Sequence, residues 1–362
     1  MSQDQLSNNS QKKVPLSIYS DEQPLESKDT IPYLLSSDLE SEIQPLTEDD
    51  DQLLAASQLM QQGIEQHKAG ELNAAMKSLK QALALFKLAE DKQKQSQVLA
   101  WLALVAYNTV DYHGAIAYAQ DCIVLTEDKP NTMIRMQAFS HLGNSYRHLN
   151  QYNQAIESLE KSLQITQYLR DKRSQVAALN NLGLVHKALG NFAQAIEYQE
   201  QSLKIVQELK DHWGEEQVLK NLGNACYALD DYPKAIYYYE QCVKLAISIN
   251  NNRSAIQVLK NLGNACYALG NYDQAIKYYQ DRLQLARETK DIRSEEQSLS
   301  SLGITYEALS NYTRAIACYE EQLLLARSIK DHRREEQAYA SLRVACYALG
   351  DYAKAMQYQQ ET

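Results

Sequence analysis

The sequence has no long apolar run. No stretch approaches the roughly 18 residues that a membrane span needs, and the opening MSQDQLSNNSQKK lacks the apolar segment of a signal peptide. Phe and Trp occur only three and two times in 362 residues, whereas Tyr occurs 25 times. The scarcity of Phe, Trp and β-branched residues, beside abundant Ala, Leu, Tyr and Gln, favours helices packed closely through small residues, and no strand is expected. We predict a soluble, cytoplasmic protein without membrane insertion.

Signatures of catalysis and metal binding are also missing. The sequence contains no HExxH, no glycine-rich loop ending in GK[ST] and no GxSxG. The seven histidines are dispersed, and the six cysteines never have CxxC spacing. We therefore expect no enzymatic activity, no cofactor and no bound metal. The cysteines are interpreted as small buried apolar residues of a reducing compartment.

The net charge of -10 is not spread evenly along the chain. Residues 1 to 52 hold twelve acidic residues and three lysines, so the remainder is nearly neutral. Nucleic-acid binding requires a clustered basic face, which this distribution does not provide. No nucleic-acid partner is expected.

Residues 1–51 form the most irregular part of the sequence. They carry four of the six prolines and little periodicity, so a disordered acidic tail is predicted. The segment IPYLLSSDLESEI, residues 31–43, mixes aliphatic, aromatic and acidic side chains. It is interpreted as a linker, or alternatively as a short motif that docks on a surface.

Residues 52–362 repeat with a period of 40 residues. KNLGNACYALDDYPKAIYYYEQ begins at Lys220, and KNLGNACYALGNYDQAIKYYQD begins at Lys260. The same register brings back a Leu-Gly step, an aromatic residue nine positions later and an alanine three positions beyond it. The predicted units span about 55–90, 95–130, 134–170, 174–210, 214–250, 254–290, 294–330 and 334–362.

Each unit has the pattern of a helical hairpin. Leu222 and Cys226 belong to an apolar stripe with helical spacing, Gly270 suits a left-handed helix end, and Asn271 suits the cap of the next helix. The small residue of the Leu-Gly step predicts close contact with a neighbouring helix. Because a hairpin of this size cannot bury its own apolar face, the units must stack into an α-solenoid.

The Leu-Gly step, the Tyr and the Ala at these offsets resemble the tetratricopeptide repeat (TPR) over residues 52–362. The period of 40 is similar to that of a subclass with extended helices, found in Leu-Gly-Asn G-protein modulators, kinesin light chains and cyanobacterial TPR proteins. The resemblance implies an all-α, right-handed superhelix. Its first helices would line a concave groove that binds peptides or other proteins.

A polar row on these first helices is the candidate binding site. Lys220, Asn224 and Tyr227 have the spacing of one helix face, and the resemblance places that face in the groove. Asparagines pair with a peptide backbone, lysines select acidic groups, and tyrosines add apolar area. The alternative is a merely solvated face. The predicted residues are Asn144, Arg147, Asn180, Asn181, Lys187, Gln217, Lys220, Asn221, Asn224, Tyr227, Gln257, Lys260, Asn261, Asn264 and Tyr267.

The predicted function is a scaffold or adaptor that binds an extended, acidic segment of a partner protein. One alternative is an autoinhibited switch whose own residues 31–46 occupy the groove. A second is a chaperone-type or complex-assembly factor, but the carboxylate clamp that Lys220, Asn224 and Asn261 resemble lacks basic residues at Gln297 and Ser301. Self-association through the C-terminal unit is a further alternative.

Overall fold

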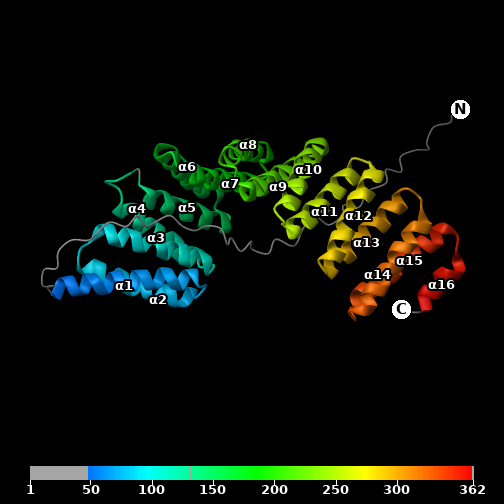
Figure 1. Ribbon diagram of the computed structural model, residues 1–362, viewed down its shortest axis with the longest axis horizontal. Helices are drawn as coiled ribbons and strands as arrows, with labels where there is room; N and C mark the ends of the chain where they lie inside the picture. Colours follow the sequence, from blue (N-terminus) through cyan, green and yellow to red (C-terminus); the bar gives the residue numbers. More distant parts are fainter. Residues whose placement is uncertain (1–47, 131, 361–362) are drawn as a thin grey trace, which may run out of the picture. The chain divides into compact units, whose positions relative to one another are not determined.

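A computed structural model describes residues 48–130 and 132–360, which contain sixteen α-helices and no strand (Figure 1). The helices are α1 (Glu48–Lys68), α2 (Leu72–Leu88), α3 (Lys92–Asn108), α4 (Tyr112–Leu125), α5 (Met133–His148), α6 (Tyr152–Leu169), α7 (Lys172–Ala188), α8 (Phe192–Leu209), α9 (His212–Ala228), α10 (Tyr232–Ser248), α11 (Asn252–Ala268), α12 (Tyr272–Glu288), α13 (Ile292–Ala308), α14 (Tyr312–Ser328), α15 (His332–Leu349) and α16 (Tyr352–Gln360).

Helix α1 begins within the segment that the sequence assigns to the tail. Its first residues are Glu48, Asp49, Asp50 and Asp51. Negative side chains in a first turn favour a helix because they are attracted to the positive end of its dipole. The acidic run therefore starts a helix. The rest of the predicted tail, with its motif at 31–43, lies outside the described residues.

The helices pair into eight hairpins, from α1 with α2 to α15 with α16, and each helix packs against the next (Figure 1). The expected all-α solenoid of helical hairpins is thereby confirmed. The predicted turn chemistry is also present: Gly190 and Gly270 have positive φ, and the Asn271 side chain accepts a hydrogen bond from the Gln274 backbone N–H. Asn191 differs, because its side chain makes no capping hydrogen bond.

The glycine of the Leu-Gly step lies against the second helix of its own hairpin. A Cβ added to Gly263 would be 2.3 Å from Cε1 of Tyr279, and one added to Gly143 would be 2.6 Å from Cγ of Leu159. In both cases the opposing residue follows sixteen positions later. The predicted close contact is confirmed, and the neighbouring helix is the hairpin partner.

The second hairpin achieves the same packing with different residues. Ala103 and Ala119 occupy these two positions there, and both are fully buried. Where the first-helix residue is larger than glycine, the second-helix residue opposite it is thus smaller than leucine or tyrosine.

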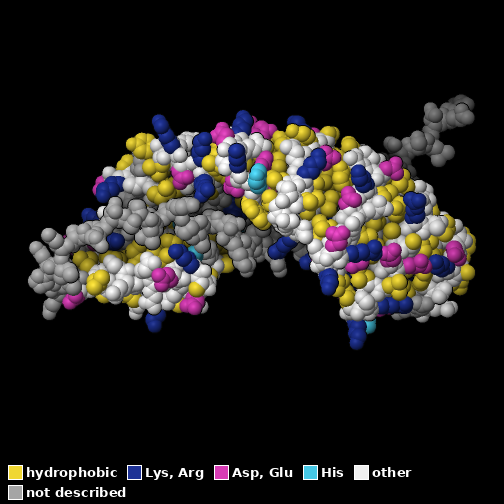
Figure 2. Space-filling model, in the orientation of Figure 1, with side chains coloured by type: hydrophobic (Ala, Val, Ile, Leu, Met, Phe, Trp, Pro, Cys, Tyr) yellow, Lys and Arg dark blue, Asp and Glu magenta, His cyan; other side chains and the backbone are white. Residues whose placement is uncertain are grey.

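The surface has no obvious segregation of charge on the face shown in Figure 2, where Lys and Arg are interspersed with Asp and Glu. Within residues 48–130 and 132–360, no helix has the apolar length that a membrane span requires.

We predict that Gly263→Ala destabilises the solenoid by about 1–3 kcal/mol, because the added methyl group overlaps the Tyr279 ring. Urea unfolding followed by circular dichroism measures this. In a Tyr279→Ala background the same substitution should cost little, because the double variant has the natural Ala103–Ala119 combination. An equal cost in both backgrounds would show that the ring contact is not the reason for glycine.

Candidate peptide-binding site

The predicted binding residues all lie on first helices of four successive hairpins, namely α5, α7, α9 and α11. Gln257 is exposed, and the others are partly buried. A partly buried polar side chain has fewer water contacts than one on an open helix face. These side chains therefore rely more on hydrogen bonds within the protein than side chains on a solvated helix face do.

Direct contacts join the predicted residues of α9 and α11. The Asn261 Nδ2 group donates to Asn224 Oδ1 at 3.1 Å, and Gln257 Nε2 donates to Asn261 Oδ1 at 3.4 Å. Both members of the doubled sequence stretch therefore contribute to one continuous polar surface.

The predicted residues of α5 and α7 are less well satisfied. Asn144 and Asn180 each bury an Oδ1 atom without a hydrogen-bond partner in the described part of the chain. Arg147 contacts His148 Nε2 through Nη2 at 3.0 Å, while its Nε is buried without a partner. Buried polar atoms without partners are uncommon in folded proteins.

Two tyrosines that the sequence did not single out fix the asparagine side chains. The hydroxyls of Tyr239 and Tyr279 donate to Oδ1 of Asn224 and Asn264 respectively, each at 2.7 Å. Both tyrosines are almost fully buried, and burial raises the pKa of both hydroxyls, which stay protonated. Because the amide oxygen faces the core, each asparagine presents its NH2 donors on the other side.

Glu216 is a second residue that the sequence did not single out. It is fully buried in α9, where its carboxylate accepts hydrogen bonds from Gln217 Nε2 at 2.8 Å and Asn251 Nδ2 at 3.3 Å, and from the Ser254 hydroxyl. Lys220 Nζ lies 3.6 Å from Glu216 Oε1. The positive charge of Lys220 is therefore balanced within the protein.

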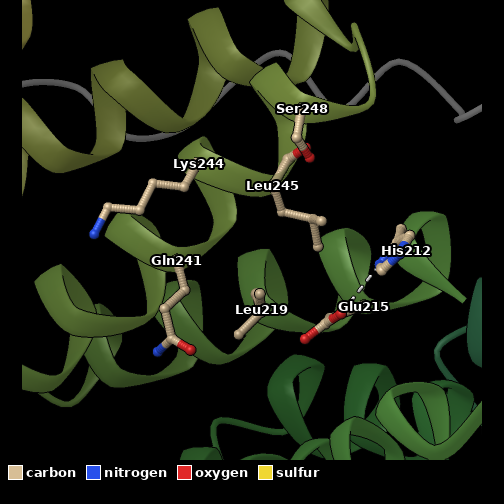
Figure 3. A pocket seen from close by; sticks show the side chains of 7 residues that line it. All are labelled: His212, Glu215, Leu219, Gln241, Lys244, Leu245 and Ser248. Carbon is tan, nitrogen blue, oxygen red and sulfur yellow. Dashed lines mark hydrogen bonds and ion pairs between the residues drawn. The ribbon is translucent and has the colours of Figure 1, made fainter. Parts of the chain in front are cut away.

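A hollow of about 400 Å³ lies elsewhere, between the first half of α9 and the second half of α10 (Figure 3). Its lining includes His212 and Glu215, whose Nδ1 and Oε2 atoms are 3.7 Å apart, and none of the predicted binding residues. The sequence analysis did not predict this hollow, although the Glu215 position recurs as Glu295 and Glu335.

A family model described as tetratricopeptide repeat matches residues 134–208, 174–248 and 214–288, and another with the same description matches residues 298–333. Together these matches span more than half of the chain. The chain belongs to the tetratricopeptide repeat family. A model described as anaphase-promoting complex subunit 5 also matches residues 44–109 of this TPR protein. No curated protein matches the sequence significantly.

Solved structures with a similar fold include the apo form of RapI (TM-score 0.55, 16% identity, 76% of this chain and 98% of that one). BtubC from P. vanneervenii has a TM-score of 0.50 at 18% identity, covering 64% and 92%. Aspartyl phosphate phosphatase F from Bacillus subtilis has 0.53 at 16% identity, covering 76% and 71%. These likenesses concern the fold alone. TPR solenoids are typically non-catalytic scaffolds for protein–protein interaction, which indicates a protein partner for this one.

We predict that Asn264→Ala destabilises the TPR solenoid by about 1–3 kcal/mol, because the buried Tyr279 hydroxyl loses its acceptor. Urea unfolding measures the change. Tyr279→Phe removes the stranded hydroxyl, so adding it to Asn264→Ala should recover part of the loss. No recovery would show that the hydroxyl is satisfied in another way.

Stability should also depend on pH through His141, which lies in α5 at the register position of Asn181 and Asn221. Burial, with a smaller effect of His67, lowers the pKa of His141 to about 4 from its usual 6.5. Between pH 4 and pH 6.5, His141 binds a proton more readily in the unfolded chain than in the folded chain. The free energy of unfolding is therefore highest above about pH 6.5 and decreases toward pH 4. In the His141→Asn variant this decrease in stability should be smaller. Urea unfolding at several pH values measures the difference. An identical pH profile for variant and wild type would contradict the assignment.

Proposed function

We propose that the solenoid holds an extended, acidic segment of a partner protein along the first helices of units three to six. The observation that carries this proposal is the orientation of Asn224 and Asn264, whose oxygens are taken by tyrosine hydroxyls. The remaining NH2 groups donate, and Lys220 and Lys260 also only donate. Backbone carbonyls and carboxylates are acceptors, so an acidic peptide complements this row.

The repeat distance supports an extended ligand. Packed helices lie about 8–10 Å apart, and an extended chain rises about 3.3 Å per residue. About three peptide residues therefore span one repeat, and a segment of about a dozen residues spans units three to six. Such a segment would meet an equivalent asparagine at Asn224 and again at Asn264.

Aromatic pairs supply apolar area beside the donors. Tyr227 packs edge-on against Tyr232 with ring centroids 5.3 Å apart, and Tyr267 packs against Tyr272 at 5.2 Å. Rings held in this way lose little conformational freedom on binding. They would contact peptide side chains that point away from the asparagines.

Selection from a random peptide library tests the proposal. The wild type should enrich peptides rich in Asp and Glu. The double variant Asn224→Asp with Asn264→Asp keeps an oxygen for each tyrosine but replaces the outward donors with acceptors and negative charge. We expect it to fold normally and to lose the acidic preference.

Asn153→Asp with Asn252→Asp is the matched control, because it adds the same charge at exposed positions of α6 and α11. This variant should select the same peptides as the wild type. The proposal would be refuted if the wild type selected peptides without acidic enrichment. It would also be refuted if the Asn224 and Asn264 variant selected the same peptides as the wild type.

A further inference from the structure

Two lysines that are equivalent in the repeat have different electrostatic surroundings. Lys220 is 3.6 Å from the buried carboxylate of Glu216. The residue at the position of Glu216 in the next unit is Ile256, which is also buried. Within the described residues, Lys260 has no ion pair or hydrogen bond, and the one charge that perturbs its pKa is that of Arg282.

Arg282 replaces a small residue of the preceding units. At this position in the second helix, Cys242 donates its thiol to the Glu216 carbonyl at 3.3 Å, and Ser162 donates to the Met136 carbonyl at 3.2 Å. Both contacts are made within one hairpin. Arg282 instead extends toward α13, where Nη1 donates to Ser298 Oγ at 3.2 Å and Nη2 donates to Gln297 Oε1 at 2.9 Å.

The guanidinium of Arg282 makes no direct ion pair among the described residues. Arg282 is only 2% exposed, and its Nε has no hydrogen-bond partner within the described part of the chain. Asp291 and Glu296 act on it electrostatically without forming an ion pair. Asp291 accepts from the Ser294 backbone N–H at 3.0 Å, and Glu296 accepts from Gln322 Nε2 at 2.6 Å.

Arg282 is nevertheless charged at neutral pH. Burial lowers its pKa to about 10, which is still well above neutrality. Burial together with the Arg282 charge also lowers the pKa of Lys260. Asp291 and Glu296 offset part of the Arg282 charge. Among the described residues, however, no carboxylate contacts either cation directly, so an anion bound between them would stabilise both.

The arrangement also fixes which atom of Gln297 faces outward. A guanidinium can only donate, so Gln297 accepts with Oε1 and its Nε2 group remains as a donor. Gln297 and Lys260 are both partly exposed. An incoming anion therefore meets two kinds of N–H donor backed by the buried charge of Arg282.

We propose that Lys260, Gln297 and Arg282 form a binding site for an aspartate or glutamate side chain. Lys260 and Gln297 donate to the two carboxylate oxygens, and Arg282 supplies a fixed positive charge behind them. The peptide origin of this carboxylate rests on the proposed function, but carboxylate binding itself does not. In unit five the equivalent place is filled by the protein's own Glu216.

The first test uses a C-terminally amidated oligo-glutamate peptide as the probe, with binding followed by fluorescence anisotropy. Lys260→Ser, Arg282→Gln and Ile256→Glu should each weaken binding by about tenfold or more, as expected for one lost charge-assisted contact. Ile256→Glu restores a carboxylate at the position of Glu216 and should occupy the site internally. Lys277→Ser is the control, because it removes an exposed charge from the same helix as Arg282.

Unchanged binding in Lys260→Ser and Ile256→Glu would overturn the site, even if Arg282→Gln fails to fold. Equal binding of amidated oligo-glutamine would also overturn it, as would tight binding that requires a free C-terminal carboxylate. Acetate should compete with the probe more effectively than inorganic phosphate, and the reverse order would contradict a carboxylate site.

Acetate separates this inference from the proposed function. If acetate raises the melting temperature of the wild type but not of Lys260→Ser, the carboxylate site exists even where the peptide library shows no acidic enrichment. If the library shows acidic enrichment, and Lys260→Ser and Ile256→Glu change neither that enrichment nor acetate binding, the proposed function stands and the carboxylate site is refuted.

Discussion

The contact between the Leu-Gly glycine and the residue sixteen positions later sets the distance between the two helices of a hairpin. Where that residue is tyrosine, the absence of a Cβ on Gly223 or Gly263 lets the ring lie against the first helix. Its hydroxyl then reaches the asparagine that follows the glycine. A packing constraint in the core therefore determines which atoms the outer surface presents. In the third unit, with Leu159 at this place, Asn144 Oδ1 has no hydrogen-bond partner among the residues that the structure describes.

The fold follows from the sequence because its determinants are local and repeated. The Leu-Gly step, the alanines and the capping residues such as Asn271 recur in a fixed register, and each specifies a contact within one hairpin. The start of α1 was harder to predict, since an acidic run is typical of both a disordered segment and the first turn of a helix. Only the apolar residues that follow the acidic run distinguish the start of a helix from a disordered segment.

The arrangement of the candidate residues on the helices was predictable, but their hydrogen bonds and charge balance were not. Periodicity places Asn224 and Lys220 on one helix face, as the structure does, yet it does not say which end of an amide is free. That depends on Tyr239, fifteen residues away. It also does not reveal that Lys220 has a buried carboxylate beside it while Lys260, within the described residues, has none. The residues responsible, Glu216 and Arg282, lie just outside the doubled stretch.

A solenoid tolerates such divergence because each unit contacts only its neighbours. The core positions of units five and six are nearly identical, so replacing Glu216 and Cys242 by Ile256 and Arg282 alters the charge of one layer without altering the backbone register. Arg282 donates hydrogen bonds to Ser298 and Gln297 of the next unit, but a buried guanidinium that has no direct ion pair among the described residues is costly to desolvate. The proposed ligand carboxylate would supply that direct ion pair. Lys260, which has no ion pair within the described residues, is therefore the better anchor for an acidic peptide.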